Sequence, residues 1–292
     1  ASGAASRMFK DLFSFLSAEY DVPTTDFEKN FFANIAKFAF YGDLDAACVK
    51  NNSQSINELI ANGNYKAVVF NLLDFTGMNY GSLPKGLLKF HSYDADARTS
   101  AEEHFVEGAL YAATDGVVKL HFTVSPNHKA LFEELVAERK AYYEQLFNVK
   151  YDITFSEQKQ STDTIAVDAD NAPFREKGSL VFRPGGHGAL IENLNDIDAD
   201  VIFIKNIDNV VPDRLKPDTV KYKKLLAGIL VEKQKRAWGD PQSPSVVLHR
   251  WDGRGYLIQK SRWIRFLQKK HQRKDQAGDE PMILLRYTGH TY

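Results

Sequence analysis

The chain has little of several features that would assign it to a class of protein. Among its 292 residues there is one cysteine, Cys48, which excludes an internal disulfide framework and suits a reducing compartment. No apolar run approaches the roughly 20 residues of a membrane span, and no charged-then-apolar signal peptide opens the chain. Repeats and low-complexity tracts are absent as well. We therefore expect a soluble, cytoplasmic protein.

The chain also lacks an excess of charge of either sign, since 37 basic residues stand against 38 acidic ones. This balance gives no argument for nucleic acid or an anionic membrane as a partner, and we expect neither. Residues 260–274 could form a basic helix that touches RNA or lipid, but a solvated face over a packed apolar side is the simpler interpretation. The sequence suggests no protein partner. With 43% hydrophobic residues, the chain can bury a sizeable α/β core.

A glycine-rich turn is the most informative feature that is present. Residues 179–182 are expected to form a short buried strand, residues 184–188 (PGGHG) a turn, and residues 189–194 the start of a helix. Such a turn leaves backbone N–H groups free, with the positive end of the helix dipole behind them. Anions and flat polar rings both suit this arrangement. An ordinary strand-to-helix turn without a ligand is the alternative.

A second apolar run, residues 201–204, ends abruptly in Asn206-Ile207-Asp208-Asn209. Ligands of open α/β sheets collect just beyond the carboxyl ends of strands. A carboxylate at that place can hold a metal or a substrate hydroxyl, which makes Asp208 a candidate ligand. The alternative is an Asx-type turn that binds nothing.

Two further loops present cations. Residues 1–7 are small residues that lead to Arg7 and into a helical stripe at residues 8–20, so they could wrap a phosphate chain, although a frayed terminus would look the same. Later, Pro84-Lys85-Gly86 precedes an apolar strand at residues 87–90. Proline and glycine constrain this backbone, and an ammonium so held can stabilise charge on a phosphate. A turn with a solvated lysine is the alternative.

Hydrophobic periodicity predicts the elements between these motifs. Residues 117–124 and 151–155 read as strands around a helix that Asn127 begins and that ends at Phe147, a βαβ unit typical of a parallel sheet. Residues 67–73 fit a buried strand or a short helix equally well. Three further helical stretches are predicted over residues 27–63, which include a helix at 55–61, over 99–114, where Thr99 is the cap, and over 218–237. The last is amphipathic, with Leu225, Leu226, Ile229 and Leu230 inward. We also predict a strand over 246–248, and packing or surface roles for His104, His121 and His128.

The motifs PGGHGALIENL and, after a gap, NIDN resemble the UDP-sugar pyrophosphorylase (uridylyltransferase) families, which are GT-A-like nucleotidyltransferases. The whole chain also resembles an uncharacterised bacterial family, domain of unknown function 4301, similar to a divergent branch of them. The resemblance covers most of residues 1–213 and implies an α/β fold. A mostly parallel central sheet would carry helices on both faces, with a helical insertion at residues 21–80 and an α+β continuation at 214–292.

The resemblance also implies a reaction, in which a sugar 1-phosphate oxygen attacks the α-phosphorus of a nucleoside triphosphate, with UTP favoured, and pyrophosphate leaves. SGAASR looks like a degenerate Gly-Gly-x-Gly-Thr-Arg loop that matches at Gly3 and Arg7, with Ser6 in place of Thr, so we expect a fragment whose preceding strand lies upstream. The resemblance implies catalytic roles for Arg7 and Lys85, which would hold the phosphates, and for Asp208, which would hold Mg²⁺. It implies nucleotide or sugar binding for Gly3 and Ser6 in the leader, and base reading for Gln158, with Gln160 as its rival. Gly185, Gly186 and His187 would contact the base and the sugar, and Asn206 the sugar.

Two other classes of function stay open at this stage. One is a non-catalytic module that binds a nucleotide or a sugar phosphate, because the first glycine loop is degenerate and no second metal carboxylate is evident. The other is a glycosyltransferase that uses a UDP-sugar on a similar sheet. The helical insertion could act as a lid or block the site.

Overall fold

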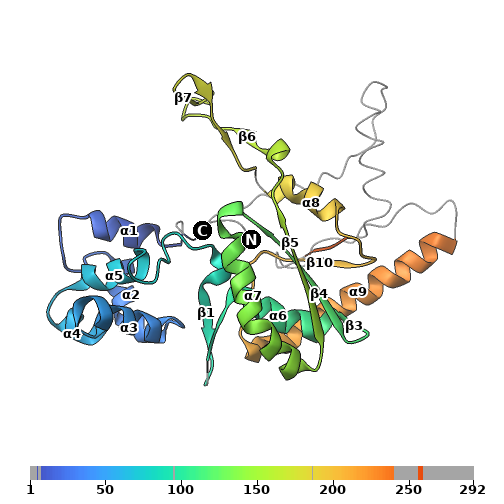
Figure 1. Cartoon of the computed structure of the whole chain (residues 1–292), viewed down its shortest axis with the longest axis horizontal. Coiled ribbons are helices and arrows are strands. Elements are labelled where there is room, and N and C mark those ends of the chain that lie inside the picture. Colours follow the sequence, from blue (N-terminus) through green and yellow to red (C-terminus); the bar gives the residue numbers. More distant parts are fainter. Residues whose placement is uncertain (1–4, 6–7, 95, 186, 240–255, 259–292) are drawn as a thin grey trace.

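The computed structural model describes residues 5, 8–94, 96–185, 187–239 and 256–258. Two hydrophobic cores organise this part of the chain. The first gathers buried residues between Ala5 and Leu88, and the second gathers buried residues between Ala101 and Ile207. Figure 1 shows the first as a group of short helices beside a second group of mixed helices and strands.

The first core is built by short helices. Their bounds are α1 Lys10–Ser17, α2 Asp26–Ala33, η2 Ile35–Lys37, α3 Tyr41–Asn52, α4 Ile56–Ala61 and α5 Tyr65–Leu73. Thr25 and Ser55 begin α2 and α4 with capping boxes. Residues 67–73, which fitted either a strand or a helix, belong to α5, where Val68, Val69 and Leu72 are buried while Phe70 is exposed. That spacing is helical, and it could be recognised only once the buried face was known.

The second core contains the predicted βαβ unit. After η3 Lys85–Leu87, the chain continues through β1 Lys89–Ser92, β2 Ala97–Thr99, α6 Ser100–Tyr111, β3 Ala113–Thr114, β4 Val117–Val124, α7 Pro126–Phe147 and β5 Lys150–Glu157. Strands β4 and β5 run parallel over their whole length, and β3 pairs antiparallel with β4. Thr99 caps α6 through a capping box with Glu102, as predicted. Asn127 does not begin α7, because Ser125 is the N-cap and Pro126 occupies the first turn.

Helices α6 and α7 cover the same face of this small sheet. Phe105 of α6 and Phe132 of α7 both contact Phe122, which points from β4 into the core. The opposite face is polar, and His121 there contacts Thr154 and Ser156 of β5. None of the described histidines joins a metal cluster. The parallel pair is one part of the expected sheet, and a larger parallel sheet with helices on both faces stays a prediction.

A narrow ribbon follows β5 and projects from the body (Figure 1). It comprises η4 Gln160–Thr162, β6 Thr164–Ile165, β7 Arg175–Glu176, β8 Ser179–Leu180 and β9 Phe182–Arg183, paired antiparallel as β6 with β9 and β7 with β8. The prediction of a buried strand over 179–182 is therefore wrong. Phe182 is 54% exposed, because the short strands of the ribbon pair with one another, β6 with β9 and β7 with β8, and project from the body (Figure 1). Helix formation after the glycine turn is confirmed by η5 His187–Leu190 and α8 Ile191–Asn195.

The last described elements are β10 Ile202–Ile204, η6 Asp213–Leu215, α9 Lys216–Gly239 and β11 Tyr256–Ile258. Strand β10 confirms the predicted apolar strand, and its partner β11 runs antiparallel. Leu230 of α9 is buried as expected, but Leu225 is 54% exposed, so its inward placement is wrong. None of the described helices is both long and apolar enough to cross a bilayer. The strand over 246–248 and the basic helix over 260–274 lie outside the described residues.

Candidate functional site

Lys85 and Asp208, which lie 123 residues apart in the chain, form an ion pair. The Lys85 Nζ atom lies 2.5 Å from Asp208 Oδ2. Their side chains are 28% and 35% exposed, so both groups are accessible to a ligand. The structure thus brings together a cation and a carboxylate that we expected in one phosphate site from separate loops.

Gly86 explains how the two loops come so close. A Cβ atom at Gly86 would lie 2.5 Å from Phe132 Cζ and 3.1 Å from Ile207 Cγ1. Because Gly86 has no side chain, the turn of η3 lies directly against α7 and against the residue that precedes Asp208. Pro84 and Gly86 therefore place Lys85 beside Asp208 through backbone packing.

Replacing Gly86 with alanine is expected to lower the free energy of unfolding by about 1–3 kcal/mol, because the added methyl group overpacks the contact with Phe132. Urea unfolding measures this loss. Gly42→Ala in α3 is the matched control, since nothing lies within 4 Å of a Cβ atom there. If Gly86→Ala lowers the free energy of unfolding no more than Gly42→Ala does, the close packing at Gly86 is contradicted.

Asp208 carries its charge at neutral pH. Burial raises its pKa, but the hydrogen bond and the positive charge of Lys85 outweigh burial and hold the pKa below its ordinary value. An ionised carboxylate is a hard oxygen ligand that fits Mg²⁺. Among the residues that the structure describes, no three His, Cys, Asp or Glu side chains gather as a metal cage. A Mg²⁺ that arrives with a phosphate ligand needs only one or two protein carboxylates, and Asp208 offers one.

Ala5, the described residue of the small-residue leader, contacts the loop before Lys85. The backbone N–H of Ala5 donates to the carbonyl of Leu83, with N and O 3.0 Å apart, and Ala5 is fully buried. This bond ties the leader to the loop that presents Lys85, although the first group of helices separates the two in the chain. Gly3, Ser6 and Arg7, the other predicted residues of the leader, lie outside the described residues.

The expected base-reading residues form a second group. Gln158 Nε2 lies 3.4 Å from the carbonyl oxygen of Gly185 and 3.4 Å from Thr162 Oγ1. Gln158 thus lies against the glycine turn, whereas its rival Gln160 is exposed in η4. Gly186 and the side chain of His187 lie outside the described part.

Asn193 attaches the helix that follows the glycine turn to the sheet. Asn193 of α8 is almost fully buried, and its Nδ2 atom donates to Ser156 Oγ at 2.9 Å and to the carbonyl of Glu157 at 2.7 Å. These bonds hold the helix after the glycine turn at the carboxyl end of β5.

Asn206 is exposed, and its carbonyl accepts the N–H of Asn209, which makes the chain turn at Asp208.

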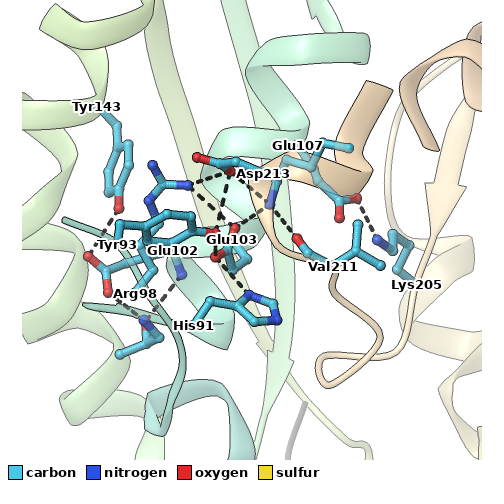
Figure 2. A network of polar contacts seen from close by, with 12 residues as sticks. His91, Tyr93, Arg98, Glu102, Glu103, Glu107, Tyr143, Lys205, Val211 and Asp213 are labelled. Carbon is cyan, nitrogen blue, oxygen red and sulfur yellow. Dashed lines mark hydrogen bonds and ion pairs between the residues drawn. The ribbon is translucent and has the colours of Figure 1, made fainter. Parts of the chain in front are cut away.

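Sequence reasoning missed a network of buried charges on α6, which Figure 2 shows. Glu102, Glu103 and Glu107 are all nearly or fully buried. Each has a cation within reach: Arg139 Nε lies 2.6 Å from Glu102, Lys216 Nζ 2.5 Å from Glu103, and Lys205 Nζ 2.5 Å from Glu107. The signal was three glutamates inside an apolar helical pattern, because a buried carboxylate needs a cationic partner.

Glu103 lies at the centre of this network. Its carboxylate accepts from Tyr93 Oη at 2.6 Å, contacts His91 Nδ1 at 2.9 Å and pairs with Lys216. Burial alone would raise its pKa, but the bonds from His91, Lys216 and Tyr93 lower the pKa to about 2. The hairpin β1–β2 and the start of α9 are thus attached to α6 through one ionised side chain.

Comparison with known proteins places the chain in a family without a known activity. No curated protein and no solved structure matches it. A family model described as a domain of unknown function, DUF4301, matches residues 1–242. This match covers Lys85, Asp208, the glycine turn and the charge network on α6. The chain therefore belongs to the DUF4301 family.

Proposed function

We propose that the protein is a nucleotidyltransferase that transfers a uridylyl group from UTP to a sugar 1-phosphate and releases pyrophosphate. The observation that carries the proposal is the accessible pair of Lys85 and Asp208, which joins two loops expected at a phosphate site. The bond from Ala5 to Leu83 supports it, because it brings the small-residue leader to the same loop.

This chemistry needs in-line positioning and charge neutralisation more than acid–base catalysis. Lys85 and Arg7 would bind phosphate oxygens, and Gly3 and Ser6 would let the leader approach them closely. Asp208 would hold Mg²⁺, which when bound neutralises charge on the phosphates. In the free protein Lys85 and Asp208 neutralise each other. When a phosphate and its Mg²⁺ bind, Lys85 would pair with the phosphate and Asp208 with the Mg²⁺, so both charges would keep a partner.

We assign the binding of the uracil base and of the sugar to the second group of residues, around Gln158 and the glycine turn. The carboxamide of Gln158 can both donate and accept hydrogen bonds, which suits the imide edge of uracil. Gly185, Gly186 and His187 would face the base and the sugar, and Asn206 the sugar hydroxyls. The contact between Gln158 and Gly185 supports this assignment.

We also place the protein in the cytoplasm of a bacterium. Cys48, the single cysteine, is buried, and this burial together with the charge of Asp45 raises its pKa to about 11. A thiol that stays protonated and buried is unreactive, which suits a reducing compartment.

The test is a thermal-shift titration with UTP, other nucleoside triphosphates and UDP-sugars, each with and without Mg²⁺. Stabilisation grows with ligand concentration over Kd, so we expect a shift that is selective for uridine and dependent on Mg²⁺. Asp208→Asn and Lys85→Met should abolish the shift and slow pyrophosphate exchange about a hundredfold. Lys89→Met is the matched control, because it breaks the comparable pair of Lys89 and Asp43, whose Nζ and Oδ2 atoms lie 2.6 Å apart.

Three results would change the assignment. Exchange rates of both variants within tenfold of the wild type would contradict the roles of Lys85 and Asp208. UTP binding without exchange would indicate a non-catalytic binding module. Sugar transfer from a UDP-sugar without exchange would indicate a glycosyltransferase.

A further inference from the structure

The carbonyl oxygen of Ile207 accepts two hydrogen bonds from α6. The hydroxyl of Ser100 donates to it, and His104 Nε2 lies 3.0 Å from it. Ser100 is fully buried and Ile207 nearly so, which limits competition from water. This carbonyl belongs to the peptide group that joins Ile207 to Asp208. The two bonds therefore fix the orientation of the backbone at Asp208.

His104 makes its bond as a neutral ring. A carbonyl only accepts, so Nε2 must carry the hydrogen. Burial and then the charge of Lys205 lower the pKa of His104 to about 4, so the ring is uncharged at neutral pH. The ring also packs edge-on against Phe122, with centroids 6.4 Å apart, which limits its rotation.

Buried ion pairs on α6 hold both ends of the segment from Lys205 to Lys216 (Figure 2). Lys205 pairs with Glu107, and Lys216 pairs with Glu103 and donates to the carbonyl of Val211 at 2.6 Å. Moving the segment would leave these charges buried without partners, which is strongly unfavourable. The turn that carries Asp208 is thus attached to α6 at its ends and at its middle.

We propose that Ser100 and His104 are positioning residues that hold Asp208 at its distance from Lys85. Ile207 links the two sides, because its carbonyl is bound by α6 while its side chain lies against Gly86. Removing the donors lets the Asp208 peptide rotate away from Lys85. The consequence for catalysis rests on the proposed function, but the geometry can be tested without a nucleotide.

A double-mutant cycle measures this coupling. Lys85→Met, Asp208→Asn and their combination are unfolded in urea in four backgrounds: wild type, His104→Leu, His104→Gln and His121→Leu. We expect the double variant to differ about fivefold, in its unfolding equilibrium constant, from the product of the effects of the two single variants. This factor should fall below about twofold with His104→Leu, because leucine has no donor, and should persist with His104→Gln, whose amide can donate.

His121→Leu is the matched control, because His121 bonds to Thr154 and Ser156 on the polar face of the sheet. The coupling should persist in that background. If His104→Leu does not fold, Ser100→Ala removes the other donor and should lower the coupling in the same way. Equal coupling in the wild type and in the background that lacks one of the two donors would overturn the proposal.

Pyrophosphate exchange with Mg²⁺ and UTP gives the second measurement. We expect His104→Leu to lower kcat about tenfold, the effect of one lost hydrogen bond, with little change in the KM for UTP, and His104→Gln to restore most of the rate. A rate for His104→Leu equal to that of the wild type would overturn the positioning role in catalysis. No exchange by the wild type would overturn the proposed function, and the cycle would still decide whether His104 positions Asp208.

Discussion

Lys216→Ala is expected to lower the free energy of unfolding by about 3–5 kcal/mol, because it leaves a buried carboxylate without its closest cation. Glu103 is fully buried, and Lys216 Nζ lies 2.5 Å from it. The guanidinium of Arg98 is farther away, with Nη1 3.7 Å from this carboxylate. The cost of stranding the charge therefore exceeds the cost of losing one surface contact.

Urea unfolding of three variants and the wild type checks this result. The double variant Glu103→Gln with Lys216→Met removes both charges, so it should recover much of the stability that Lys216→Ala loses. Lys150→Ala is the control, since Lys150 is 78% exposed and its contact with Glu144 should contribute less than about 1 kcal/mol. A loss below about 1 kcal/mol for Lys216→Ala would show that Glu103 is not held as a buried anion.

Stability is expected to fall as the pH drops from about 6.5 to about 4, because His104 is neutral in the folded protein. The unfolded chain binds a proton on this residue near its ordinary pKa of 6.5, whereas the folded chain binds it near 4. The contribution of His104 is thus fully present above the higher value and lost below the lower one. The difference amounts to at most about 3 kcal/mol.

Unfolding free energies at pH 7.5 and pH 4.5 test this dependence in the wild type and in His104→Gln. The variant should lose most of the change with pH. Burial lowers the pKa of His121 too, so His121→Gln is the control and should keep the larger part of the change. Protonation of Glu103 affects stability in a separate pH range, because its pKa is about 2 in the folded protein and 4.5 ordinarily. Identical changes in the wild type and in His104→Gln would show that His104 titrates normally.

Much of the local structure could be predicted from the sequence, because its signals lie within a few residues of one another. The capping boxes at Thr25, Ser55 and Thr99 set the starts of α2, α4 and α6. Alternation over β4 and β5 around a charged helix predicted the βαβ unit, and the parallel pairing confirms it. The ribbon was mispredicted at Phe182, because an apolar run indicates a strand without showing what covers it.

The candidate site could be predicted in part. Lys85, Asp208, Gln158 and Gly185 were singled out from turns and from the resemblance, and the structure brings them together as two pairs. Gly86 was recognised as a turn residue, but its contact with Ile207 depends on a loop more than 100 residues away. Their roles in uridylyl transfer stay predictions.

The sequence by itself determined the capped starts of several helices, the parallel strand pair and the loops that present Lys85 and Asp208, because periodicity, caps and turns are local. Only the tertiary structure decided which charges are partners. Glu107 pairs with Lys205, 98 residues away in the chain, and Glu103 pairs with Lys216, 113 residues away. No local pattern predicts a partner at such a separation. Burial decided the rest, since it keeps His104 neutral, whereas hydrogen bonds from His91, Lys216 and Tyr93 keep Glu103 charged despite its burial.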